Sequence, residues 1–184
     1  MSIDPEAAYR QLCAKIDDFF ERVENAHGDQ MQCATGCYDC CLTRLSITLV
    51  EATAIVRHLA AVPEDQREAI RAAAQSAPQG RCAALDERGR CRVYTARPLI
   101  CRSHGVPIRR REPGRSLPVV DVCLRNFAAE GALEAVPDGD QLDQDTLSTM
   151  SATIDAAFSD AVGAPRGTRI DLAELLSDPD QFFE

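Results

Sequence analysis

The chain has 184 residues, a formal net charge of -9 at pH 7 and nine cysteines, and 45% of its residues are hydrophobic although only 5% are aromatic. This length can bury one ordinary hydrophobic core, so the fold does not need the disulfides of a small secreted scaffold. Because there is no apolar run of roughly 20 residues and no apolar leader around Asp4 and Glu6, we expect a cytoplasmic protein without a membrane partner, whose cysteines stay reduced.

Residues 5–26 have the apolar spacing of an amphipathic helix, and Pro5 suits the first turn after Asp4 as the capping residue. Cys13 lies on the apolar stripe of this helix, so we interpret it as a small buried hydrophobic residue and not as a ligand. The other members of the stripe are Tyr9, Leu12, Ile16, Phe19, Phe20 and Val23.

Two helices are predicted after the first cysteines. Thr48 and Glu51 form a capping-box signature, which predicts a helix over about 49–61. A second helix follows Pro63 and runs to about Gln75. The Pro and Gly residues that come next end the helical pattern.

Residues 82–94 have the pattern of two short strands around a turn at 87–89. Such a hairpin would bring Cys82 and Cys91 together across its ladder. We therefore expect these two cysteines to form a pair of ligands.

The rest of the chain is predicted to be mostly helical. Pro98 suits the start of a short helix that carries Cys101, and Asp171 with Glu174 repeats the capping-box pattern. The other expected elements are extended segments at 108–111 and 117–120 around a turn at Pro113–Gly114, and a helix over about 146–161.

These elements predict a mainly α fold with short β-hairpins around a cysteine-lined metal centre. We expect a single domain over residues 1–184. Its cysteine-cluster core would span about 30–127, between a flanking helix at 5–26 and helices over about 146–177.

Eight of the nine cysteines fall into two compact groups of four along the sequence. Four thiolates match a tetrahedral zinc site or an iron–sulfur cluster. A disulfide framework is the alternative, but clustered cysteines in a reducing compartment are more often metal ligands. The predicted ligands are Cys33, Cys37, Cys40 and Cys41 in the first group and Cys82, Cys91, Cys101 and Cys123 in the second.

The adjacent pair Cys40 and Cys41 bears on the identity of the metal. In an extended backbone neighbouring side chains point to opposite sides, so the two thiols would not readily bind one ion. This favours a polynuclear centre, and only one C-x2-C pair occurs, whereas structural zinc sites usually have two. We therefore favour an iron–sulfur cluster or iron, with zinc as the alternative.

Charge is unevenly distributed, with a net charge of -5 in residues 1–80, +7 in 81–128 and -11 in 129–184. The basic segment either packs against the acidic C-terminal part or binds an anion, and the first interpretation is favoured. Under the second, the Arg109–Arg111 run would orient an acidic small molecule or peptide; nucleic acid is not expected as a partner. Arginines also flank the cysteines, where they would lower thiol pKa values and donate to sulfur: Arg44, Arg81, Arg90, Arg92 and Arg102.

Three further polar residues lie near the predicted ligands. His104 follows Cys101 by three residues, and we interpret it as a hydrogen-bonded neighbour of the site more readily than as a ligand. Asp39 and Asp121 could act as acid or base, although no nucleophile is paired with them in the sequence. No catalytic residue is assigned.

Together these motifs resemble the YkgJ-type cysteine-cluster family, the CxxCxxCC proteins. The resemblance rests on the runs 35–41, 89–94 and 94–102 and on Cys123, and it covers about residues 30–127. In this chain three residues separate Cys33 from Cys37, whereas the family has two. The family is described as zinc- or iron-chelating and in part as iron–sulfur oxidoreductases, and a flagellin lysine methylase belongs to it. This chain has no Gly-rich loop for S-adenosylmethionine, so methylation is not implied.

Two functions agree with the sequence. A closed, fully thiolate-ligated centre would make the protein a structural zinc module, a metal carrier or an accessory protein. An iron centre with an open coordination position would suit a redox or modifying enzyme. Because the sequence has no nucleophile–base pair, phosphate loop or cofactor fingerprint, the metal-chelating function is favoured over catalysis.

Overall fold

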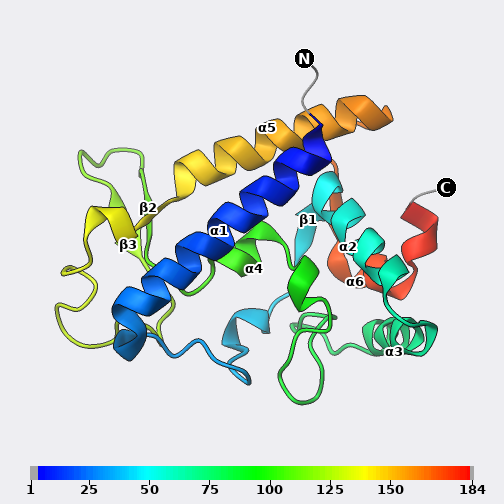
Figure 1. Ribbon diagram of the computed structural model, residues 1–184, viewed down its shortest axis with the longest axis horizontal. Coiled ribbons are helices and arrows are strands. Elements are labelled where there is room, and N and C mark those ends of the chain that lie inside the picture. The colour runs from blue at the N-terminus through cyan, green and yellow to red at the C-terminus, as the bar shows by residue number, and fades with distance from the viewer. Residues whose placement is uncertain (1–3, 183–184) are drawn as a thin grey trace. The chain divides into compact units, whose positions relative to one another are not determined.

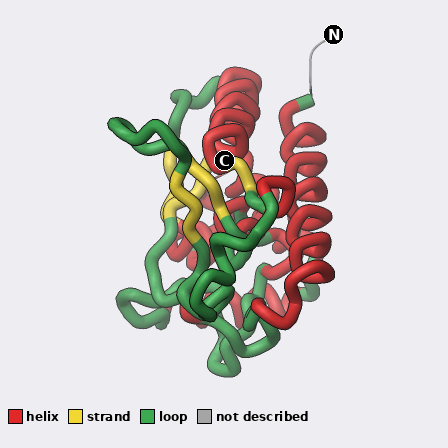
Figure 2. The backbone as a smooth tube through the Cα atoms, turned by 90° about the vertical axis from the view of Figure 1, so that its left-hand side faces the viewer, coloured by secondary structure: helices red, strands yellow, loops and turns green. Residues whose placement is uncertain are grey.

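The structure is a computed structural model that describes residues 4–182. Helices are its main regular structure and every strand has two or three residues, which confirms the predicted mainly α class (Figure 2). None of the helices in these residues combines the length and the apolar composition that crossing a membrane demands.

The chain divides into two compact units, which we describe separately. The first unit contains the residues up to 34 together with 99–153, and the second contains 35–98 and the residues from 154 onward. The single domain over 1–184 stays a prediction.

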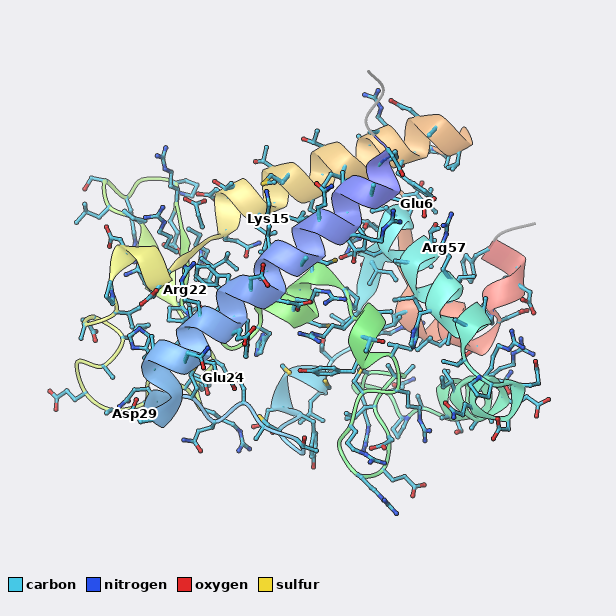
Figure 3. The ribbon with its side chains drawn as sticks, in the orientation of Figure 1. Glu6, Lys15, Arg22, Glu24, Asp29 and Arg57 are labelled. Carbon is cyan, nitrogen blue, oxygen red and sulfur yellow. The ribbon has the colours of Figure 1, made fainter. Side chains whose placement is uncertain are left out.

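Helix α1 (Pro5–His27) belongs to the first unit and begins as predicted, because the Asp4 carboxylate accepts two backbone N–H groups of the first turn. Cys13 is 7% exposed on the buried stripe, as expected for a small hydrophobic residue. Lys15 and Glu24, labelled in Figure 3, are exposed. The helix is therefore amphipathic, with one apolar face covered by the first unit.

The remaining elements of the first unit are short. Helix α4 packs on α1, and β2 and β3 form the hairpin predicted around Pro113–Gly114, side by side in Figure 1. A third strand, β4, which the sequence did not predict, pairs with β2 in parallel. The bounds are α4 (Leu99–Ser103), β2 (Ile108–Arg110), β3 (Val119–Asp121) and β4 (Leu142–Asp143); α5 (Gln144–Val162) contributes its residues to 153 here and the rest to the second unit.

The second unit has a small core between helices and a two-stranded sheet. The capping box of α2 is present, with the Glu51 carboxylate 2.9 Å from the backbone N of Thr48 and 3.0 Å from its hydroxyl. Antiparallel pairing of β1 with β5 joins the two segments of this unit, and α3 packs on α6. The bounds are β1 (Ser46–Thr48), α2 (Leu49–Ala61), α3 (Glu64–Gln75), β5 (Arg169–Asp171) and α6 (Leu172–Ser177).

The predicted hairpin at 82–94 is confirmed in part: the chain reverses at 87–89, and the backbone N–H groups of Asp86 and Arg92 donate across it to the carbonyls of Arg90 and Ala84 at 2.8 Å, but the two predicted strands do not form. Residues 82–93 form turns with one isolated bridge between Leu85 and Cys91. The Asp86 carboxylate accepts the backbone N–H groups of Arg88 and Arg90 at 2.9 and 2.8 Å. These side-chain bonds hold a tight turn in place of a regular strand ladder.

Candidate metal centre

A short loop of the second unit carries Cys37, Cys40 and Cys41 and ends in a single 3₁₀ turn, Asp39–Cys41. The N–H of Cys41 donates to the carbonyl of Tyr38 at 2.8 Å, which closes the turn. Because the backbone is helical here, the sulfurs of Cys40 and Cys41 lie 4.0 Å apart. The expectation that these neighbours point to opposite sides of an extended strand is therefore wrong. Cys37, at the start of the loop, is half-buried.

A second loop brings Cys82 and Cys91 to the same place. The N–H of Cys82 donates to the carbonyl of Cys41 at 2.7 Å, so the loop that begins at Cys82 is fixed to the 3₁₀ turn. The reversal at Gly89, with φ of 74°, and the bridge at Cys91 return the chain toward Cys82. The two loops together gather thiols that are about 40 to 50 positions apart in the sequence.

The electrostatics of these thiols show that they interact. The pKa of Cys91 is raised to about 11, chiefly by burial and also by the charges of Cys82 and Cys40, whereas a hydrogen bond from the Val93 backbone and the charge of Arg97 lower it. Burial also raises the pKa of Cys82, again with a contribution from Cys40. At neutral pH these two thiols carry their protons, so a metal ion must displace them on binding.

The other predicted ligands belong to the first unit. Cys33 accepts a hydrogen bond from Nδ2 of Asn126 at 3.2 Å, and Cys101 is half-buried on α4. Cys123 lines a cavity of about 410 Å³ together with His104. The cysteines are thus divided differently between the units than along the sequence. Cys33 belongs to the first unit, whereas Cys37, Cys40 and Cys41 belong to the second.

Asn126 is a site residue that sequence reasoning missed. It is 1% exposed, and besides Cys33 its amide binds the backbone carbonyl of Gly105 at 2.7 Å and the N–H of Gln32 at 2.8 Å. The only local signal is its position three residues after Cys123. Nothing in that spacing reveals a partner 93 residues away.

Three of the arginines that flank the cysteines, Arg44, Arg81 and Arg90, bind oxygen atoms, whereas the buried Nε of Arg92 has no hydrogen-bond partner among the described residues. Arg81 donates to the carbonyl of Asp86 at 2.7 Å, and Arg90 pairs with the carboxylate of the same residue at 3.1 Å. Arg44 pairs with Asp171. The charge of Arg97, which the sequence had not assigned to the site, lowers the pKa of Cys91.

The basic run of the first unit is largely neutralised. Two of its three guanidinium groups form ion pairs, Arg109 with Asp143 at 3.2 Å and Arg110 with Glu112 at 2.7 Å. Arg111 donates through its backbone N–H to the Asp145 carboxylate at 3.0 Å. Pairing with Asp143 is what the favoured interpretation of the charge pattern predicted, because this aspartate belongs to the acidic C-terminal part.

The donor chemistry of the second unit fits a thiophilic metal, because Cys40, Cys41, Cys82 and Cys91 supply four thiols from two joined loops. In the present arrangement no three His, Cys, Asp or Glu side chains of residues 4–182 are grouped closely enough to hold an ion. Binding therefore requires these side chains to converge.

Comparison with known proteins bears on the same segment. Residues 32–114 match the model of the CxxCxxCC family, whose description reads "Putative zinc- or iron-chelating domain". The resemblance identified from the cysteine motifs is thus confirmed. No curated protein and no solved structure matches the chain.

Proposed function

Because residues 32–114 match a zinc- or iron-chelating family, we propose that this protein binds one zinc or iron ion through Cys40, Cys41, Cys82 and Cys91. The observation that carries the proposal is the close approach of the two loops: the N–H of Cys82 donates to the carbonyl of Cys41 at 2.7 Å, and the sulfurs of Cys40 and Cys41 lie 4.0 Å apart. The charge of Cys40 also raises the pKa of Cys82 and of Cys91, and a bound cation would remove this repulsion between thiolates.

The distance between the adjacent cysteines supports a single ion. A tetrahedral zinc ion with Zn–S bonds of about 2.3 Å holds its sulfurs about 3.8 Å apart. The sulfurs of Cys40 and Cys41 are 4.0 Å apart. The two adjacent thiols can therefore bind the same ion, so we favour zinc or a single iron ion over an iron–sulfur cluster. A reducing compartment such as the cytoplasm suits this chemistry, because thiols there remain available as ligands.

Metal analysis of protein purified without oxygen tests the proposal. We expect about one zinc or iron ion per chain and no acid-labile sulfide. Cys40→Ser and Cys91→Ser should lose this metal, whereas Cys13→Ala, which alters a buried cysteine of α1, should retain it. Metal-free wild-type protein, or full occupancy in both serine variants, would refute the assignment; stoichiometric sulfide and a coloured protein would restore the iron–sulfur cluster.

A second candidate function is favoured by the cavity of about 410 Å³ in the first unit. His104, Cys123 and Asp121 all line it, so an iron ion bound there would have space beside it for a small acidic ligand. Such an open site would suit a redox or modifying enzyme. An iron spectrum that shifts on adding a small carboxylate, and no longer shifts in His104→Ala, would support this function, whereas an unresponsive spectrum would count against it.

A further inference from the structure

The ring of Tyr38 lies directly against Gly89, although the two residues belong to different loops. A Cβ atom added at Gly89 would lie 2.5 Å from Cδ1 of the ring and 3.1 Å from Cε1. Real Cβ contacts are essentially never that short, so the ring occupies the space that any other residue would need. The absence of a side chain at position 89 therefore allows the close approach.

A second side chain contacts the same ring. The guanidinium carbon of Arg81 lies 5.9 Å from the ring centroid of Tyr38, within the range of a cation–π interaction. Arg81 is itself fixed by its hydrogen bond to the carbonyl of Asp86. Tyr38 thus contacts both ends of the loop that carries Cys82 and Cys91.

We propose that Tyr38 is a positioning residue that holds the two cysteine loops in register before metal binds. The backbone hydrogen bond from Cys82 to Cys41 joins the loops at one point and alone leaves rotation about that point. The Tyr38–Gly89 contact supplies a second point and the Arg81–Tyr38 contact a third, and together they restrict this rotation. Fixing the donors in advance lowers the entropic cost of binding.

This inference rests on the proposed metal site and names residues that would not bind the metal. Loss of a group that orients ligands typically lowers metal affinity by about 10- to 100-fold. We expect a loss in this range for Tyr38→Ala. Tyr38→Phe should stay close to wild type, because the contacts with Gly89 and Arg81 are made by the ring.

The glycines of the second unit provide a matched control. Gly80 has φ of 76°, nearly the same as Gly89, but a Cβ atom there would meet nothing within 4 Å. Gly80→Ala therefore measures the backbone strain alone. Gly89→Ala adds displacement of the Tyr38 ring and should weaken binding by about tenfold relative to that control. In a Tyr38→Ala background the two alanine substitutions should have equal effects, because the displaced ring is absent.

The test is competition for Zn²⁺ against a chromophoric chelator, with Co²⁺ spectra of each variant to show that the thiolate ligands are retained. Weaker binding with an unchanged Co²⁺ spectrum, rescued by Tyr38→Phe, is the expected result. If wild type binds Zn²⁺ and both Tyr38→Ala and Gly89→Ala match the Gly80→Ala control, the positioning role is overturned while the site stands. If wild type binds neither metal, both proposals fail.

Discussion

Asn126 allows a test of the first unit that is independent of metal. Its Oδ1 accepts one hydrogen bond, from Gln32 at 2.8 Å, and its Nδ2 donates two, to Gly105 at 2.7 Å and to Cys33 at 3.2 Å. Asn126→Ala removes all three and leaves the buried Gly105 carbonyl without that donor. At about 1 kcal/mol for each bond, plus a small term for the cavity left behind, the free energy of unfolding should fall by about 3–4 kcal/mol.

Denaturant unfolding in the presence of a chelator measures this loss, and thermal unfolding should show a midpoint lower by about 6–16 °C. Asn25→Ala is the matched control, since Asn25 is exposed on α1 and its replacement should change stability by less than about 0.5 kcal/mol. Asn126→Asp should be at least as destabilising as alanine, because it loses both donors and buries a charge. If Asn126→Ala and the control differ by less than about 1 kcal/mol, the structural role assigned to Asn126 is refuted.

Three further predictions concern single residues. Gly105→Ala should destabilise the protein more than Gly131→Ala in denaturant unfolding, because a Cβ atom at 105 would lie 2.6 Å from Sγ of Cys33 whereas one at 131 meets nothing within 4 Å; equal losses would show that crowding at 105 is unimportant. Burial raises the folded pKa of Cys91 to about 11, above the value of about 8.5 of an unfolded thiol, so the folded state keeps a proton that the unfolded chain has released. The stability of metal-free protein should therefore hold below about pH 8 and fall by roughly 1.4 kcal/mol per unit between pH 9 and 11, and Cys91→Ala should flatten this fall; a wild-type curve that is level to pH 11 would contradict the assignment. Glu51→Ala should cost about 1 kcal/mol through loss of the capping box, while Glu51→Gln, which keeps an acceptor oxygen, should cost less, and the reverse order would argue against the cap.

The helices were predictable because their signals are local. Asp4 and the Thr48–Glu51 pair cap the helices whose starts they predicted, and Asp171 caps α6 in the same way. Each signal lies within four residues of the backbone groups it satisfies. Strands β4 and β5 carried no such signal, because two or three residues are too few to establish an alternating pattern and no turn was predicted beside them, as Pro113–Gly114 was between β2 and β3.

The candidate site was predictable in its residue types but not in its geometry. The sequence predicted two strands around a turn at 87–89, and the turn is present, but the Asp86 carboxylate binds two N–H groups of the same segment and the pairing is limited to one bridge. For Cys40 and Cys41, the relative direction of the side chains depends on whether the backbone is extended or helical. Their spacing in the sequence does not specify which.

The second unit is built from two segments that lie far apart in the sequence, and this has a consequence for biosynthesis. Helix α6, the last of the α-helices in the described chain, leaves the ribosome after the segment from 35 to 98, and its residues Leu172, Leu175 and Leu176 are at most 2% exposed in the core of the second unit. Until they emerge, the segment from 35 to 98 lacks part of its own core, although its cysteines have already been synthesised. During this interval the nascent chain presents thiols without the fold that buries Cys82 and Cys91, so protection from oxidation must come from the cell's reductants or from metal captured during translation.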